Sequence, residues 1–137
     1  MEAIVNVTLA ERIRRARRVY LIGNGGSYAN AAHLASDLLS CGVRAYTLDP
    51  AFLTATANDS DYAYVFSSWL NVVGEPGDLL IALSGSGQSP NILRALQEAK
   101  RIGMDAHLVT DYLRTRDMQQ SEEDQLVLGH ELMRALR

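Results

Sequence analysis

Val19-Tyr20-Leu21-Ile22-Gly23-Asn24-Gly25-Gly26-Ser27-Tyr28-Ala29-Asn30-Ala31-Ala32-His33-Leu34-Ala35-Ser36-Asp37 is the stretch that decides the fold. The apolar and aromatic run Val19 to Ile22 predicts a short buried strand, and the glycines after it allow a tight turn. Ser27 can then cap an alanine-rich helix over Tyr28 to Ser40. The start of a helix beside bare backbone offers unpaired N–H groups to an anion. This loop is therefore either an anion site or a structural turn.

A second loop of the same kind decides between these two interpretations. Ser84-Gly85-Ser86-Gly87-Gln88-Ser89 follows the apolar run Leu79 to Leu83. It precedes Pro90, which suits the first position of a helix capped by Ser89 and running to Lys100. In a parallel sheet the loops after neighbouring strands meet at one edge, where such sheets bind ligands. The pair of loops therefore favours one phosphorylated ligand held by both.

The rest of the chain alternates strands with helices. Such alternation predicts a three-layer α/β/α sandwich with a doubly wound, flavodoxin-like parallel sheet of about four strands. The order 2-1-3-4 would place the two loops side by side at the switch point. Further strands are predicted at Val43 to Leu48 and at Ala106 to Thr110. Further helices are predicted to start at Thr8 and to span Ala51 to Ala57 and Ser121 to Leu136. One more helix is predicted to follow a cap at Asp59, Ser60 or Asp61.

Length and charge restrict the function classes. The 137 residues predict one domain over 1–137, and the net charge of −3 gives no general reason to bind nucleic acid or an anionic membrane. No apolar run reaches the roughly 20 residues of a membrane span, and Cys41 alone forms no internal disulfide. The start of the chain lacks a signal-peptide pattern, so we expect a cytoplasmic protein.

Two clusters have ordinary structural interpretations. The first helix carries five arginines, which favour a solvated face or an oligomer contact. An apolar and aromatic stripe at helical spacing favours core or subunit contact over a cofactor site. The arginines are Arg12, Arg14, Arg15, Arg17 and Arg18, and the stripe is Tyr62, Val65, Phe66, Trp69 and Leu70.

Two nucleotide-binding motifs fit poorly. No G-x-x-x-x-G-K-[ST] motif is present, so nucleotide hydrolysis has no support. A dinucleotide fold is a weaker alternative, since Gly23-Asn24-Gly25 opens its fingerprint and Asp49 ends the second strand where a ribose-binding acid belongs. Tyr28 occupies the third glycine position, and the second serine loop would be unexplained.

Five motifs together resemble the sugar isomerase (SIS) domain and, within it, the phosphoheptose (sedoheptulose 7-phosphate) isomerases. They occur in the order and at the spacing of that family as far as about Thr110. The family has a further loop and strand before its last helix, where this chain has only a polar linker over Asp111 to Gln120. The motifs are Gly23 to Ser27, Asn30 to Asp37, Leu53 to Asp59, Ser84 to Asn91, and Glu122 to His130.

The resemblance implies a sugar-phosphate site and a pair of catalytic side chains. In this family a carboxylate on the first long helix and a histidine on the last one transfer the protons, which here are Asp37 and His130. Asp37 is a departure, because the family carries the longer glutamate there. The expected substrate-binding residues are Asn24, Gly25, Gly26, Ser27, Asn58, Asp59, Ser84, Ser86 and Ser89.

A metal site stays open at the sequence level. Asn30, His33 and Asp37 form a polar stripe on their helix. His33 and Asp37 alone could be a simple helix pair, a base with its orienting partner, or two metal ligands. By resemblance, the zinc ligands of some family members match His33, Asp37, Glu122 and His130, with Glu122 replacing a glutamine. These donors could hold Zn²⁺, or Glu122 could instead cap its helix.

Two functions remain open at this stage. The first is aldose–ketose isomerisation of a phosphorylated sugar, such as sedoheptulose 7-phosphate, through an enediolate; both histidines, His33 and His130, are present for it. The second is a non-catalytic SIS module that senses a sugar phosphate or docks on a partner, which the short chain favours. The resemblance also implies a homo-oligomer, a tetramer with its sites between subunits.

Overall fold

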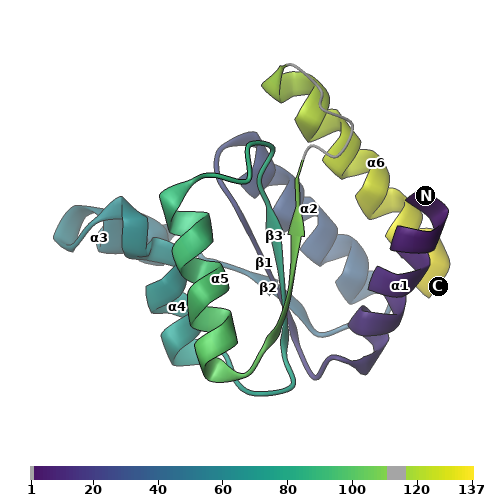
Figure 1. The fold of residues 1–137 in the computed structure, drawn as a ribbon, viewed down its shortest axis with the longest axis horizontal. Helices are drawn as coiled ribbons and strands as arrows, with labels where there is room; N and C mark the ends of the chain where they lie inside the picture. Colours follow the sequence, from purple (N-terminus) through teal and green to yellow (C-terminus); the bar gives the residue numbers. More distant parts are fainter. Residues whose placement is uncertain (1, 111–116) are drawn as a thin grey trace.

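The computed structural model describes residues 2–110 and 117–137, with side chains from Leu9 onward. It is a three-layer α/β/α sandwich, as the sequence predicts. Figure 1 shows α3, α4 and α5 on one side of the central sheet and α1, α2 and α6 on the other. None of the described helices is long and apolar enough to cross a membrane.

The sheet has four parallel strands in the order β2-β1-β3-β4. This confirms the predicted order 2-1-3-4. The central strands β1 and β3 run in register, with Gly23 opposite Leu83, so their two loops begin side by side. The strands are β1 (Val19–Gly23), β2 (Ala45–Thr47), β3 (Leu79–Leu83) and β4 (Asp105–Val109).

Alternate residues of the central strands supply two cores, one on each face of the sheet. Leu21 and Ile81 pack with α1, α2 and α6, whereas Ile22 and Leu80 pack with α4 and α5. Both central strands are buried throughout, as expected of a parallel sheet covered on both faces. The aromatic stripe is partly core: Phe66 is fully buried, but Tyr62 is exposed.

Most helix boundaries agree with the sequence within a few residues. Pro90 begins α5 and Gly103 ends it in the left-handed conformation that glycine tolerates best. Asp61 caps the short 3-10 helix η1 through the N–H of Ala63. The helical elements are α1 (Glu2–Arg15), α2 (Gly26–Ser40), α3 (Pro50–Asp59), η1 (Tyr62–Tyr64), α4 (Val65–Val73), α5 (Pro90–Ile102) and α6 (Met118–Leu136).

Three boundary predictions are wrong. Helix α1 begins at Glu2, so Thr8 lies inside it and does not start it. Helix α2 begins at Gly26 after Gly25, so Ser27 lies in its first turn and makes no capping bond. Helix α6 begins at Met118, where Asp117 accepts from the N–H of Gln120. Part of the predicted linker, residues 111–116, lies outside the described residues.

The interpretation of the arginines as a solvated face is wrong for Arg12. Its guanidinium donates two hydrogen bonds of 2.8 Å to Asp105 and one of 2.8 Å to the Ala106 carbonyl, which ties α1 to β4. The same guanidinium holds the pKa of Asp105 below its usual value. Arg17 and Arg18 pair with Glu75 at the surface. Arg12 thus has a structural role in anchoring the edge strand.

Candidate functional site

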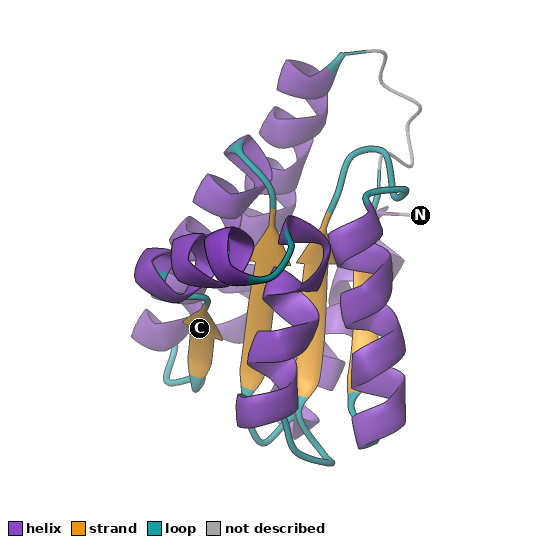
Figure 2. Ribbon diagram, turned by 90° about the vertical axis from the view of Figure 1, so that its left-hand side faces the viewer, coloured by secondary structure: helices purple, strands orange, loops and turns teal. Residues whose placement is uncertain are grey.

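The two glycine and serine loops are joined by a pair of amide side chains. Asn24, after β1, and Asn91, in the first turn of α5, each donate a 2.9 Å hydrogen bond to the other's amide oxygen. The Tyr62 hydroxyl donates a further bond of 2.6 Å to the Asn24 oxygen. Figure 2 shows the loops at the edge where the strand arrows end. Asn24, which was predicted to bind substrate, therefore connects the first loop to α5 and to η1 through hydrogen bonds.

The Ser84–Ser89 loop folds around its own serines. The Ser84 hydroxyl oxygen is buried and accepts from the N–H of Gly87, and the Ser86 oxygen accepts from the N–H of Gln88, each at 3.1 Å. Ser89 stands at the N-cap of α5 but makes no side-chain capping bond. The hydroxyls of Ser84 and Ser86 can still donate, since each oxygen is used here only as an acceptor.

Helix α6 packs its first turns against both loops. Gln125 donates to the Ser27 hydroxyl at 3.0 Å and accepts from Asn30 at 3.0 Å. A Cβ placed on Gly85 would lie 2.5 Å from the Ser121 hydroxyl oxygen, so the start of α6 lies close against this loop. The buried stripe of α6 begins with Ser121 and Gln125 and continues to Leu132, and Leu128 and Leu136 pack in part against the same core. The polar start of that stripe faces the first loop and the first turns of α2.

Glu122 lies at the start of α2. A Cβ on Gly26 would be 2.2 Å from the Glu122 Cδ and Oε2 atoms and 2.3 Å from Oε1. The Glu122 carbonyl accepts from Asn30 at 2.8 Å, which fixes the backbone there. The Glu122 carboxylate therefore occupies the space that a side chain on residue 26 would fill, and it would have to move aside for any residue other than glycine.

Three predicted side chains converge between α2 and α6. His33 Nε2 lies 3.3 Å from Asp37 Oδ2 and 3.3 Å from His130 Nε2, and His130 Nε2 lies 3.8 Å from Asp37 Oδ2. Asp37 Oδ2 is buried and accepts no hydrogen bond from a described residue. Both imidazole rings stay about half exposed. The helix places His33 and Asp37 one turn apart, and the packing of α6 adds His130.

These three side chains fit a zinc ion. Their donor atoms lie within 4.8 Å of one another, and imidazole nitrogen and carboxylate oxygen are ordinary zinc donors. Bond lengths of about 2.0–2.1 Å in a tetrahedral site separate its donors by roughly 3.3 Å, close to the separations seen here. A buried Asp37 oxygen that accepts no hydrogen bond from a described residue is also what a metal ligand would leave. Glu122, the fourth candidate, is not in this group in the described structure.

Asn58 and Asp59 are less directly placed. They lie at the end of α3, where the Asn58 amide donates to the Asp59 carboxylate at 3.1 Å. Their connection to the first loop runs through η1, whose Tyr62 binds Asn24. Sequence reasoning assigned no role in the site to Asn91 or Gln125, and it placed Tyr62 in the apolar stripe. Asn91 could have been found from its place in the first turn after Pro90, where its side chain can reach back to the loops.

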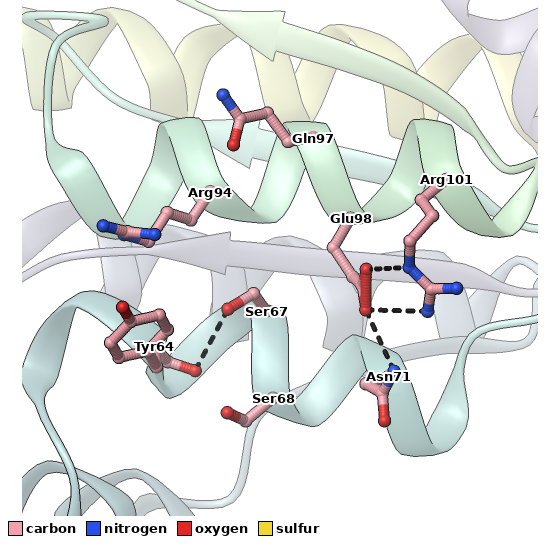
Figure 3. A pocket seen from close by; sticks show the side chains of 8 residues that line it. All are labelled: Tyr64, Ser67, Ser68, Asn71, Arg94, Gln97, Glu98 and Arg101. Carbon is pink, nitrogen blue, oxygen red and sulfur yellow. Dashed lines mark hydrogen bonds and ion pairs between the residues drawn. The ribbon is translucent and has the colours of Figure 1, made fainter.

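A groove on the other face of the sheet has no link to these residues. It encloses about 490 Å³ between α4 and α5. Figure 3 shows its charged groups paired within it: Arg101 donates to Glu98, which holds the pKa of that carboxyl below its usual value, and Asn71 donates to the same carboxylate. The Arg94 guanidinium lies 4.5 Å above the Tyr64 ring. The groove between α4 and α5 is therefore lined by polar side chains, several of which bond to one another.

Comparisons with known proteins agree with this fold and with these loops. The model of the SIS domain matches residues 3–110. Phosphoheptose isomerase of Desulfovibrio desulfuricans is 42% identical over 104 residues, which are 70% of this chain and 50% of that protein. Phosphoheptose isomerase of Thermodesulfovibrio yellowstonii is 31% identical over 144 residues, covering 89% of this chain and 72% of that one.

The solved structure of phosphoheptose isomerase GmhA from Neisseria gonorrhoeae shares the fold. It superposes with a TM-score of 0.85 at 23% identity, covering 98% of this chain and 84% of that one. The chain spans about half the length of the first curated relatives that it matches. From the family match and the shared architecture, the chain belongs to the SIS domain family.

Proposed function

We propose that this chain, as a single SIS domain over 1–137, binds a phosphorylated sugar and interconverts its aldose and ketose forms, in the manner of a sedoheptulose 7-phosphate isomerase. The observation that carries the proposal is the convergence of His33, Asp37 and His130. Such a group can move protons at adjacent carbon and oxygen atoms. Curated relatives named phosphoheptose isomerase, at about 40% identity, support the same reaction.

The phosphate would be held by the two loops. Ser84 and Ser86 can donate their hydroxyl protons, and Ser89 has a hydroxyl free of capping bonds. Backbone N–H groups at the start of α5 would add to this neutral cradle. Asn24, Gly25, Gly26 and Ser27 would close the site from the first loop, with Asn58 and Asp59 nearby.

The distance between loops and cluster suits a long sugar. Ser27 and His33 are six residues apart on α2, which corresponds to about 9 Å of helix rise. An extended seven-carbon chain with a terminal phosphate spans a comparable distance. Its carbonyl end would then reach His33, Asp37 and His130 while the phosphate stays in the loops.

The reaction requires a base and a proton donor. Asp37 would take the proton from the carbon beside the carbonyl; the electrons of that C–H bond form the enediolate double bond, and the carbonyl oxygen takes a proton from His130. Return of the carbon-bound proton to the former carbonyl carbon, with loss of the hydroxyl proton from the carbon that was first deprotonated, moves the carbonyl to that carbon and completes the isomerisation. If Zn²⁺ instead occupies the facing atoms of His33, Asp37 and His130, it would polarise the carbonyl, and those atoms would not be free to transfer the protons.

Hydrogen exchange tests the proposal directly. With sedoheptulose 7-phosphate in deuterated water, the purified chain should introduce deuterium at the carbons that exchange a proton during isomerisation, read by NMR. A matched sample with a chelator, and one with added zinc, measure the contribution of a metal. Binding of the sugar phosphate without any exchange in all samples would refute the isomerase and leave a non-catalytic SIS module.

Removing the loop hydroxyls should weaken binding. The double change Ser84→Ala and Ser86→Ala should cost roughly 1–3 kcal/mol of sugar-phosphate binding free energy, because phosphate oxygens lose their donors. Calorimetry gives the affinity. Ser68→Ala, in the groove on the other face, is the control and should bind as the unchanged protein does. Equal affinity of the double variant would contradict the loop assignment.

We also propose that the chain acts as a homo-oligomer in the cytoplasm. Large apolar side chains are exposed on several helices, and symmetric association would cover them. A tetramer follows from the family resemblance, and light scattering measures it. The cytoplasm is where a phosphorylated sugar, which does not cross membranes unaided, would be met. The exposed side chains include Leu39, Tyr62, Val72, Met118 and Val127.

A further inference from the structure

The start of α2 already has an anion beside it. The Glu122 carboxylate packs against Gly26, the first residue of that helix, so closely that a Cβ on residue 26 would overlap it. Among the described residues, no lysine, arginine or histidine forms an ion pair with Glu122. The positive end of α2 is thus the compensating charge that this carboxylate contacts.

The position of Glu122 is imposed by its neighbours. Ser121 and Gln125 are buried against the two loops, and the Glu122 carbonyl accepts from Asn30. Glu123, the next residue, is exposed to solvent. The backbone of α6 therefore holds Glu122 at the first loop, while rotation about its side-chain bonds could withdraw the carboxylate without moving the helix.

We propose that Glu122 competes with phosphate for the start of α2, and so limits the affinity of the site for phosphorylated ligands. The proposal rests on the proposed function, because it concerns the same two loops. A carboxylate and a phosphate a few ångströms apart repel each other, and both are attracted to the same helix end. A sugar phosphate must displace the Glu122 side chain before the first loop can contact it. Sugars without phosphate lack the charge that would do so.

The test compares three proteins that differ by one charge. Calorimetry with sedoheptulose 7-phosphate, and separately with inorganic phosphate, is done in a chelator so that no metal bridges the ligand to Glu122. Glu122→Gln removes the repulsion and should bind both ligands about tenfold more tightly. Glu123→Gln loses the same charge on the same helix and should stay within about twofold of the unchanged protein. Glu122→Asp, which draws the carboxylate back, should lie between them.

A second measurement is independent of ligand. Without phosphate, Glu122→Gln should melt at a lower temperature than Glu123→Gln, because only Glu122 contacts the start of α2. Equal or weaker phosphate binding by Glu122→Gln would overturn the proposal, as would no measurable binding by that variant. Tighter phosphate binding without any hydrogen exchange on the sugar would refute the isomerase and leave this inference standing.

Discussion

Replacing His130 with alanine is expected to abolish turnover while leaving sugar-phosphate affinity nearly unchanged. His130 lies in the cluster with His33 and Asp37, about two helical turns from Glu122 and the loops. Phosphate would be bound by those loops, so its binding free energy should not depend on the His130 imidazole. The proton transfer should depend on this imidazole, because no other described side chain in that cluster comes from α6. Steady-state kinetics and calorimetry on the same preparation measure both quantities.

Two further variants separate a proton-transfer role from a metal-binding one. His130→Gln keeps a hydrogen-bonding side chain of similar reach but cannot transfer a proton near neutral pH, so it should be as inactive as His130→Ala. If the cluster acts only by holding zinc, His33→Ala should lose as much rate as His130→Ala, and a chelator should reproduce both. Retention of more than about a tenth of the rate by His130→Ala would remove this residue from the mechanism.

The fold could be predicted from short patterns of apolar residues and glycines in the sequence. The two apolar runs, Val19 to Ile22 and Leu79 to Leu83, are each followed by a glycine-rich loop and a helix, which is sufficient to predict parallel central strands. The observed order β2-β1-β3-β4 confirms this. The predicted starts of helices were less accurate than the strand order. Gly25 and Asp117 stand at the N-caps of α2 and α6, which Ser27 and Ser121 were predicted to begin.

Site residues that lie close together in the sequence could be predicted to meet, whereas those far apart in the sequence could not be placed from spacing alone. His33 and Asp37 meet because they are four residues apart on one helix, which spacing alone predicts. His130 is 97 residues from His33, and only the family resemblance placed it there. The Asn24–Asn91 pair and the Gln125 bonds depend on how α5 and α6 pack on the loops.

Glu122 shows the limit of motif matching most clearly. The resemblance made it one of four candidate metal ligands, but in the described structure its carboxylate lies at Gly26. Its direction is decided by the buried neighbours Ser121 and Gln125, which fix the rotation of α6. A motif specifies which residue occupies a position, whereas the tertiary packing specifies where its side chain points.

Replacing Asp37 with asparagine is expected to lower the isomerisation rate by about 10²-fold or more if Asp37 is the general base. Asparagine has nearly the same shape, so the packing between α2 and α6 should survive, but it cannot accept the carbon-bound proton. The buried Asp37 Oδ2 has no hydrogen bond from a described residue to hold it, which leaves that oxygen available as a base. The measurement is kcat with sedoheptulose 7-phosphate, together with hydrogen exchange from deuterated water.

Asp37→Glu is the matched variant, because it keeps the charge and extends the carboxylate by one methylene. The family carries glutamate at this position, so this change should keep or raise the rate. A carboxylate misplaced by about 1 Å can cost roughly 10²-fold, which makes the sign of the change informative. A lower rate for glutamate would mean that α2 and α6 hold the shorter side chain at its working distance from His33 and His130. Equal rates for aspartate, asparagine and glutamate would show that Asp37 is not the base, and that the proton is taken by another group.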